Sequence, residues 1–229
     1  MMRVSINTVF IAPSILNANF DNLENEIAKI STTADLLHLD IMDNKFVPNF
    51  TFDIKRAFEI ISFSKLPVDA HLMIEDPDSI APRYAQTGCN SVTFHLEAAS
   101  NVLQTISDIK SNGAKVGIAI KPATKFSEVE PFIEKIDMLL IMTVEPGFGG
   151  QSFMHDQMVK VVAARKRINQ IPQLRPLLQI DGGVSLDTIA EAAAAGANCF
   201  VAGSAVYKSS DPAGMVSQLR NKAQISFIG

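Results

Sequence analysis

The sequence contains little cysteine, and this limits the chemistry that it can carry. Cys89 and Cys199 are the only two cysteines among 229 residues, and no CxxC motif is present. Two isolated cysteines exclude a disulfide framework and a dithiol redox motif. Each lies close after a glycine at the start of an apolar run, so we expect both to be small buried residues. A reducing cytoplasm is the expected compartment.

The sequence also lacks a strong excess of charge and a long apolar run. Its formal net charge is −4, with acidic and basic residues interspersed. This balance offers no electrostatic surface to nucleic acid or to an anionic membrane, and neither is expected as a partner. No run reaches the roughly 18 apolar residues that suggest a membrane-spanning helix. The opening MMRVSINTVFIAPSIL is interrupted by Ser5, Asn7 and Thr8, and it predicts a first strand rather than a signal peptide.

What the sequence does have is a regular alternation of two patterns. Its composition is 47% hydrophobic without low-complexity segments, which suffices for one large α/β domain or two small ones. Short apolar runs alternate with segments of helical periodicity, such as Phe20, Leu23, Ile27 and Ile30. The expected strands are Val9–Leu16, Asp35–Met42, Val68–Met73, Ser91–Glu97, Lys115–Lys121, Met138–Val144, Pro176–Asp181 and Cys199–Val206.

The ends of the expected helices follow one recurring scheme. In QTGCNSVTF, SNGAKVGIAI and AAGANCFVAG, a helix meets a glycine and the next strand begins at once. Glycine supplies the left-handed conformation that stops a helix. Strands that alternate with helices at a spacing of roughly 25–30 residues favour a (β/α)8 TIM barrel. We therefore predict one barrel domain over residues 1–229, with a doubly wound open sheet as the alternative.

Polar and ionisable residues gather at the ends of the expected strands. In LLHLDIMDNKFVPN, His38 and Asp40 are two residues apart, so their side chains project to the same side of a strand. The carboxyl ends of barrel strands form the active-site mouth. The residues expected there are His38, Asp40, His71, His95, Glu97, Lys121, Glu145 and Asp181.

Four of these residues suit a metal ion. Imidazole and carboxylate together serve divalent transition metals, here Zn²⁺, Fe²⁺, Mn²⁺ or Co²⁺. We predict one such cation per chain with the ligands His38, Asp40, His71 and Asp181. His95 and Glu97 are expected as a pair outside the ligand set. His155 is expected to be exposed.

Glycines form a second group at three neighbouring strands. EPGFGGQSF (145–153), DGGV (181–184) and AGSAV (202–206) follow or span the last three expected strands. Glycine lets backbone N–H groups approach an anion, and barrels often bind phosphate at the loops after strands 7 and 8. These turns predict a phosphate pocket. Met42, Met73 and Met142 lie nearby, either as ordinary core or as an apolar collar that excludes water.

The motifs together resemble one known family. APSIL, HLDIMDNKFVPN, DAHLM, FHLEA, KPAT, MTVEPGFGGQSF, QIDGGV and AGSAV occur in the order found in ribulose-phosphate 3-epimerases. The resemblance covers Ile11 to about Pro212, and HLDIMD and VEPGFGGQ are its most specific parts. It implies a (β/α)8 barrel that interconverts D-ribulose 5-phosphate and D-xylulose 5-phosphate in the pentose phosphate pathway.

The resemblance also implies roles for individual residues. The metal ligands of the family fall on His38, Asp40, His71 and Asp181, and its acid/base pair falls on Asp40 and Asp181. Family members are commonly homo-oligomers. The substrate contacts that it implies are Ser14, His71, Gly147, Phe148, Gly149, Gly150, Asp181, Gly182, Gly183, Gly203 and Ser204.

Three positions depart from the pattern of the family. Asn44 and Asp53 stand in the second loop where glycine is usual, and Ala123 replaces the glycine of KPGT. Asn tolerates a positive φ, so Asn44 is expected to be conservative. Asp53 is expected either to cap the following helix or to add negative charge at the mouth.

Inversion of C3 next to a ketone needs a group that removes a proton on one face and a group that returns one on the other. Asp40 and Asp181, on nearly opposite walls, suit that task through a planar enediolate. The nearest alternative substrate is a hexose such as allulose 6-phosphate. Alternatives of other classes are a Schiff-base aldolase that uses Lys121 and a non-catalytic phosphosugar-binding barrel.

Overall fold

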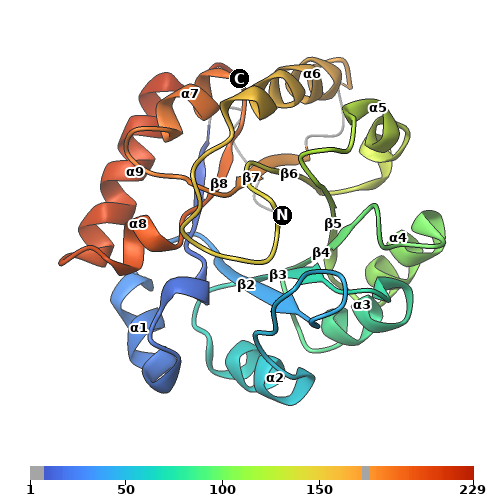
Figure 1. The fold of residues 1–229 in the computed structure, drawn as a ribbon, viewed down its shortest axis with the longest axis horizontal. Coiled ribbons are helices and arrows are strands. Elements are labelled where there is room, and N and C mark those ends of the chain that lie inside the picture. The colour runs from blue at the N-terminus through green and yellow to red at the C-terminus, as the bar shows by residue number, and fades with distance from the viewer. Residues whose placement is uncertain (1–7, 172–175) are drawn as a thin grey trace.

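The strands of the chain form the wall of a barrel, and the helices surround it (Figure 1). The computed structural model describes residues 8–171 and 176–229. Within these residues, neighbouring strands run parallel in one eight-stranded sheet, in the order β1-β8-β7-β6-β5-β4-β3-β2. The predicted (β/α)8 architecture is therefore confirmed.

The strands and helices alternate along the chain. The strands are β1 (Phe10–Ala12), β2 (Leu37–Met42), β3 (Val68–Met73), β4 (Ser91–His95), β5 (Lys115–Ile120), β6 (Met138–Met142), β7 (Leu177–Asp181) and β8 (Cys199–Val201). The α-helices are α1 (Leu23–Ile30), α2 (Ile54–Phe63), α3 (Pro77–Ala85), α4 (Val102–Ser111), α5 (Phe126–Val129), α6 (Met158–Asn169), α7 (Ile189–Ala194), α8 (Ser204–Tyr207) and α9 (Pro212–Ser226). Short 3₁₀ turns are η1 (Ile15–Asn17), η2 (Phe20–Asn22), η3 (Glu130–Lys135) and η4 (His155–Gln157).

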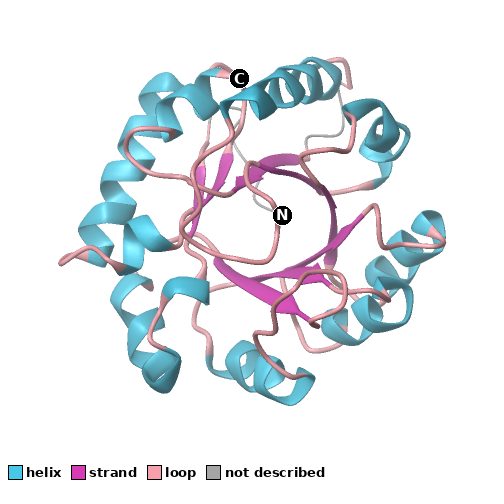
Figure 2. Cartoon of the chain, viewed as in Figure 1, coloured by secondary structure: helices cyan, strands magenta, loops and turns pink. Residues whose placement is uncertain are grey.

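Figure 2 shows the strands as a ring, which closes between β1 and β2 through single contacts rather than a ladder. The Asp35 N–H donates to the Ile11 carbonyl at 3.0 Å, and the His38 N–H donates to the Pro13 carbonyl at 3.0 Å. Ser14 and His38 form an isolated parallel bridge just beyond β1. These contacts join the two ends of the sheet, which a doubly wound open sheet would leave apart.

Residues alternate along each strand between the helices and the barrel axis. Leu39 of β2 belongs to the large core cluster that includes Ile27 of α1 and Ile60 of α2. His38 and Asp40 alternate with Leu39, so their side chains face the axis. A parallel sheet covered on both faces needs such nearly continuous buried strands.

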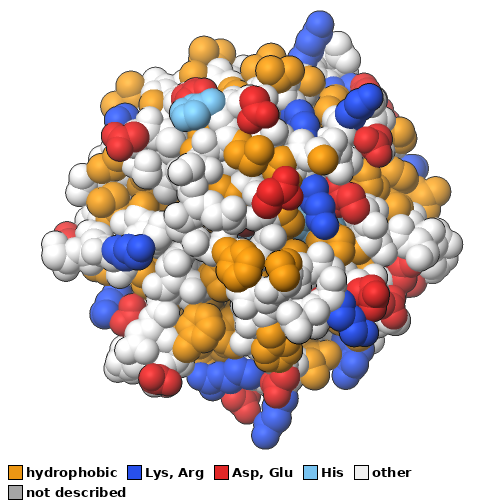
Figure 3. Space-filling view, in the orientation of Figure 1, with side chains coloured by type: hydrophobic (Ala, Val, Ile, Leu, Met, Phe, Trp, Pro, Cys, Tyr) orange, Lys and Arg blue, Asp and Glu red, His pale blue; other side chains and the backbone are white. Residues whose placement is uncertain are grey.

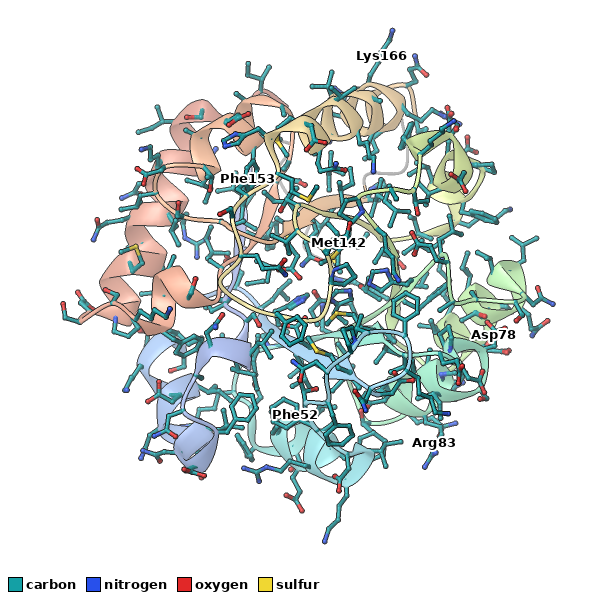
Figure 4. The ribbon with its side chains drawn as sticks, viewed as in Figure 1. Phe52, Asp78, Arg83, Met142, Phe153 and Lys166 are labelled. Atoms are coloured by element: carbon teal, nitrogen blue, oxygen red, sulfur yellow. The ribbon has the colours of Figure 1, made fainter. Side chains whose placement is uncertain are left out.

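The inside of the barrel holds smaller apolar groups. One cluster joins Ala12, Leu36, Cys199 and Val201, and another joins Ala119, Leu140, Met142 and Val144. Figure 4 shows the Met142 side chain near the middle of the ring, whereas Lys166 and Arg83 point outward. Cys89 and Cys199 are both free and buried, as the sequence predicted.

The predicted limits of the first strand were wrong. The strand expected over Val9–Leu16 ends at Ala12. Pro13 has no N–H to donate to a ladder, and the Ser14 hydroxyl accepts from the Leu16 N–H at 3.2 Å, which starts η1. The part of the predicted N-terminal strand segment that falls on residues 1–7 lies outside the described residues.

The predicted end of the last strand was also wrong. The strand expected over Cys199–Val206 ends at Val201, and helix α8 follows from Ser204. Gly203 has φ −90° and ψ −81°, and its carbonyl accepts from the N–H groups of Val206 and Tyr207. Of the other expected strands, Val68–Met73 matches the observed one at both ends, and each of the rest differs from the observed strand by one or two residues at one end.

The predictions for the helix-ending glycines and for Asn44 hold. Gly88, Gly113 and Gly196 have φ of 89°, 91° and 110° at the ends of helices, as the helix–glycine–strand scheme requires. Asn44 adopts φ 57°. Ala123 is exposed in the turn after β5. Among the described residues, no helix combines the length and the apolar composition that crossing a membrane requires.

Substitution of Asp53 tests how α2 begins. Its carboxylate accepts from the Arg56 N–H at 2.7 Å and so caps the helix. Asp53→Ala should lower the free energy of unfolding by about 0.5–2 kcal/mol, because the N–H loses its acceptor. Asp53→Asn keeps an acceptor and should cost only a fraction of that. Urea denaturation measures both, and equal losses would contradict the cap.

Candidate metal centre and substrate pocket

Four donor atoms converge at the carboxyl end of the barrel. Asp40 lies beside His71 in the register of β2 and β3, and Asp181 ends β7. Asp40 Oδ1 lies 3.1 Å from His71 Nδ1 and 3.4 Å from His38 Nε2. Asp181 Oδ2 lies 3.8 Å from His71 Nδ1 and 4.0 Å from His38 Nε2. One ligand atom from each of the four residues lies within 4.8 Å of the others.

This spacing fits a single bound cation. Ligand atoms about 2.0–2.2 Å from a tetrahedral metal would be about 3.3–3.6 Å from one another. The separations between His38 Nε2, His71 Nδ1 and the two carboxylates, 3.1–4.0 Å, bracket that value. Two imidazole nitrogens and two carboxylate oxygens suit the borderline divalent transition metals. The four residues could therefore hold a metal ion.

The electrostatics of the cluster favour added positive charge. Burial opposes ionisation of Asp40, but the neighbouring His38 and His71 hold its pKa far below the usual range. Burial and the charge of Asp40 raise the pKa of Asp181 to about 6. Burial disfavours the charged form of His38, yet the carboxylates of Asp40 and Asp69 outweigh it and raise its pKa. The raised pKa values of His38 and Asp181 favour bound protons next to Asp40, where a cation would neutralise the same carboxylates.

Asp69 supports His38 from below. Its carboxylate oxygen Oδ2 lies 2.9 Å from His38 Nδ1, and Asp69 itself is fully buried. Ser91 donates to the other oxygen at 2.8 Å, and the Gln179 amide donates to Oδ2 at 2.9 Å. A carboxylate behind a ligating imidazole fixes the orientation of the ring. The His38 ring therefore presents Nε2 to the cluster.

His95 and Glu97 stand behind His71, as a pair outside the donor set. His71 Nε2 lies 2.9 Å from His95 Nε2, and His95 Nδ1 lies 3.2 Å from Glu97 Oε2. Burial lowers the pKa of His95 to about 4, despite the neighbouring Glu97. Burial opposes ionisation of Glu97, but hydrogen bonds from His95, Thr124 and the Lys121 N–H lower its pKa to about 2.

Asp40 and Asp181 are also fixed by neighbours. The Ser14 hydroxyl donates to Asp40 Oδ2 at 2.5 Å. Thr143 donates from its N–H and its hydroxyl to the Asp181 carbonyl, at 2.7 and 2.9 Å. Both strand ends are therefore held in place before any substrate binds.

A pocket opens directly above the donor cluster. Its walls bring together three groups: the carboxylates, the methionines and the glycine turns after β6, β7 and β8. The lining residues include Ser14, Asn17, Asp40, Met42, Met73, Met142, Gly147, Phe148, Gly149, Gly150, Asp181, Gly182, Gly183, Gly203 and Ser204. Of the predicted substrate contacts, His71 lies below the pocket and is fully buried. Met42, Met73 and Met142 are buried and line this pocket.

Several glycines in these turns pack closely against neighbouring atoms. Gly183 has φ +65°, and a Cβ there would lie 2.6 Å from the backbone nitrogen of Phe153. A Cβ on Gly203 would lie 2.5 Å from Asn17 Oδ1, and one on Gly149 would lie 2.8 Å from Asn17 Nδ2. The amide of Asn17 therefore sits between two of the glycine turns, inside the pocket.

Two loops meet at the rim of the pocket. The Asn49 amide donates to the Gly147 carbonyl at 2.8 Å, and Val47 lies close to Gly147. The space-filling view shows this face, with hydrophobic side chains over its middle (Figure 3). The loop after β2 is thus tied to the glycine loop after β6.

Other predicted residues lie away from the cluster. The Lys121 ammonium lies 3.7 Å over the ring of Phe46, and Lys121 is absent from the described residues that line the pocket. His155 is exposed and pairs with Glu191 at 2.7 Å. The main-chain carbonyl of Glu145 accepts a hydrogen bond from the Gln151 amide.

The sequence analysis missed two residues, Asp69 and Asn17. Asp69 precedes His71 by two positions, and that spacing could have placed both on the inner face. Asn17 carries no comparable signal, because its contacts come from the loops after β6 and β8.

Comparison with known proteins agrees with this geometry. The sequence matches the Ribulose-phosphate 3 epimerase family over residues 10–207. It is 47% identical to the ribulose-phosphate 3-epimerase of Mycobacterium leprae (strain TN) over 213 residues, which are 93% of this chain and 94% of the relative. It is 40% identical to the ribulose-phosphate 3-epimerase of Escherichia coli (strain K12), over 93% and 95% of the two chains.

The chain belongs to the ribulose-phosphate 3-epimerase family.

An epimerase is an isomerase by definition, so membership of the ribulose-phosphate 3-epimerase family makes this chain an isomerase. Solved structures show the same fold at low identity. The 3-hexulose-6-phosphate synthase of Salmonella typhimurium has a TM-score of 0.71 at 18% identity and covers 95% of this chain and 99% of its own. KGPDC from Streptococcus mutans has a TM-score of 0.70 at 12% identity, over 96% of this chain and 100% of its own.

Elemental analysis tests the metal centre. Protein purified without chelator should carry about one divalent cation per chain. His38→Ala and His71→Ala each remove a donor, so metal affinity should fall by more than the roughly 10–100-fold caused by loss of an outer partner. His155→Ala is the matched control, because His155 is exposed and pairs with Glu191 instead.

The affinity of the site for the cation should also depend on pH. Affinity should fall as pH is lowered through about 6, because Asp181 must release its proton before it can ligate. Full occupancy in His38→Ala and His71→Ala would remove both histidines from the ligand set.

Proposed function

We propose that the protein catalyses the reversible C3 epimerisation of D-ribulose 5-phosphate and D-xylulose 5-phosphate. The observation that carries this proposal is the pair of carboxylates Asp40 and Asp181, which line one pocket from β2 and β7. Strands β1 and β8 separate β2 from β7 on the short side of the ring. The two acids can therefore approach a substrate carbon from different sides.

In this proposal, Asp40 and Asp181 act as acid and base. One removes the C3 proton, which leaves a planar enediolate, and the other returns a proton to the opposite face. Their pKa values are pushed apart, that of Asp40 downward and that of Asp181 upward to about 6. In the site without a cation, one carboxyl is therefore ionised and the other protonated near pH 6. The roles exchange in the reverse reaction.

His38, Asp40, His71 and Asp181 would hold the divalent cation, which we propose to be Zn²⁺, Fe²⁺, Mn²⁺ or Co²⁺. When bound, it supplies positive charge that favours loss of the C3 proton and stabilises the resulting negative charge. Ser14 holds the orientation of Asp40 through the hydrogen bond to Oδ2.

We assign the phosphate of the substrate to the glycine turns. The pocket is lined by Gly147, Phe148, Gly149 and Gly150 after β6, by Gly182 and Gly183 after β7, and by Gly203 and Ser204 after β8. Backbone N–H groups in such turns bind an anion without a cluster of arginines. The methionine collar of Met42, Met73 and Met142 would exclude water from the reacting carbon.

We also propose a homo-oligomer in the cytoplasm that works in the pentose phosphate pathway. Phe50, in the loop after β2, is exposed by 57%, and a contact with a second subunit would cover this large apolar side chain. The two unpaired cysteines suit a reducing compartment.

The alternatives differ in substrate or in nucleophile. An allulose-6-phosphate 3-epimerase would use the same acids, and only its pocket length would differ. A Schiff-base aldolase needs a lysine that reaches the substrate, whereas the Lys121 ammonium lies over the ring of Phe46 and Lys121 is absent from the described residues that line the pocket.

A coupled assay separates these substrates. Turnover of D-ribulose 5-phosphate should exceed that of allulose 6-phosphate, and dialysis against a chelator should abolish it until metal is restored. Borohydride added with substrate should trap no adduct at Lys121. Preference for the hexose would replace the pentose assignment, and a trapped adduct would favour the aldolase.

Isotope exchange tests the two acids. In D2O, early product should carry deuterium at C3 while remaining substrate is largely unlabelled, because the delivering acid equilibrates with solvent. Asp40→Asn and Asp181→Asn should each lose about 10²–10⁴-fold or more in kcat. Metal content measured on the same samples controls for loss of the cation. Early wild-type product without label would mean that one group returns the original proton.

A further inference from the structure

The two histidines of the donor cluster face it through different nitrogens. His38 presents Nε2 and His71 presents Nδ1. A neutral imidazole carries one N–H and one lone pair, and only the lone pair can bind a cation. Each ring must therefore keep its single proton on the nitrogen that faces away from the cluster. The hydrogen-bond partner of that far nitrogen decides whether it does.

For His38 the partner is direct. Nδ1 lies 2.9 Å from Asp69, a carboxylate that also receives hydrogen bonds from Ser91 and Gln179. The Asp69 carboxylate can only accept, so the proton of His38 is held on Nδ1. The lone pair of Nε2 is then directed into the cluster.

For His71 the nitrogen that faces away from the cluster contacts another histidine. The two rings alone do not decide which of them donates the hydrogen bond. His71 Nε2 and His95 Nε2 lie 2.9 Å apart, and either could donate. If His95 donated, the proton of His71 would sit on Nδ1 and face Asp40 and Asp181. His71 could then not act as a ligand.

Glu97 removes this ambiguity. Its Oε1 accepts from the main-chain N–H of Lys121 at 2.7 Å and from the Thr124 hydroxyl, and its Oε2 lies 3.2 Å from His95 Nδ1. The main-chain N–H can only donate, and the carboxylate can only accept. The proton of a neutral, fully buried His95 therefore sits on Nδ1, its Nε2 accepts, and His71 donates from Nε2.

We propose that Glu97, acting through His95, is a positioning residue that fixes the tautomer of His71 and thereby makes His71 a metal ligand. Asp69 does the same for His38 without an intermediary. The proposal rests on the metal centre of the proposed function. It gives the His95–Glu97 pair, which lies outside the donor set, a role in metal binding.

The hydrogen bonds that run from Glu97 through His95 to His71, here called the relay, predict a large effect of a nearly isosteric change. In Glu97→Gln, the Lys121 N–H still requires the amide oxygen, so the amide NH2 turns toward His95 Nδ1. His95 must then accept at Nδ1 and donate from Nε2, and the proton of His71 moves to Nδ1. One substituted atom outside the donor set thus changes the tautomers of both His95 and His71.

Nitrogen-15 NMR of histidine-labelled, Zn²⁺-loaded protein tests the relay directly. The chain has four histidines, so four imidazoles are observed, and His155→Ala identifies the exposed one. The wild type should show a proton on Nδ1 of His38, on Nε2 of His71 and on Nδ1 of His95. A proton on Nδ1 of His71 in the loaded wild type would overturn the proposal, and this measurement needs no variant of the relay.

Chelator competition supplies the second readout. Glu97→Gln should raise the Kd for Zn²⁺ by about 10–100-fold. Thr124→Val is the matched control, because it removes a hydrogen bond to the same carboxylate but leaves the acceptor facing His95, and its Kd should stay within about threefold of the wild type. Circular dichroism confirms that both variants fold.

An unchanged Kd in folded Glu97→Gln would overturn this proposal while the proposed function stands. A wild type that binds no Zn²⁺, Fe²⁺, Mn²⁺ or Co²⁺ would overturn the metal centre and this proposal together.

Discussion

The close approach of two carboxylates, one buried and one half-buried, at the end of a barrel is the constraint on which the rest of the structure depends. Asp40 and Asp181 offer ligand atoms within 4.8 Å of each other. At an effective dielectric constant of about 20, two such charges repel by about 3–4 kcal/mol. The chain relieves this repulsion with the imidazoles of His38 and His71 and with a proton on Asp181, whose pKa rises to about 6. A divalent cation would relieve it by attraction to both carboxylates.

This constraint extends into the barrel below the cluster. Barrel interiors are usually filled by branched apolar side chains, but here fully buried Asp69 and Gln179 occupy the layer under His38. Asp69 supplies the acceptor that a ligating imidazole needs behind it, and Gln179 donates to Asp69. The layer has a cost: the side-chain oxygen of Gln179 receives no hydrogen bond from the described residues. An unpaired buried oxygen of this kind costs about 1–3 kcal/mol.

The sequence predicted the barrel and grouped the donor residues because both depend on local periodicity. The spacing of His38 and Asp40 places them on one face of a strand, and the glycines that end helices mark each repeat. The sequence did not predict contacts made across the barrel. Asp69 and Gln179 are 110 positions apart, and no local pattern indicates their hydrogen bond. The ends of the first and last strands were missed because, within apolar runs, Pro13 has no N–H for the ladder and Gly203 leaves the extended conformation.

Anomalous diffraction from crystals of the protein soaked in Zn²⁺ or Co²⁺ tests the central claim most directly. The account predicts one strong peak per chain in the space between the strand ends. That peak should lie about 2.0–2.2 Å from His38 Nε2, Asp40 Oδ1, His71 Nδ1 and Asp181 Oδ2. A peak bound elsewhere, or a cluster that stays empty at saturating metal, would contradict it.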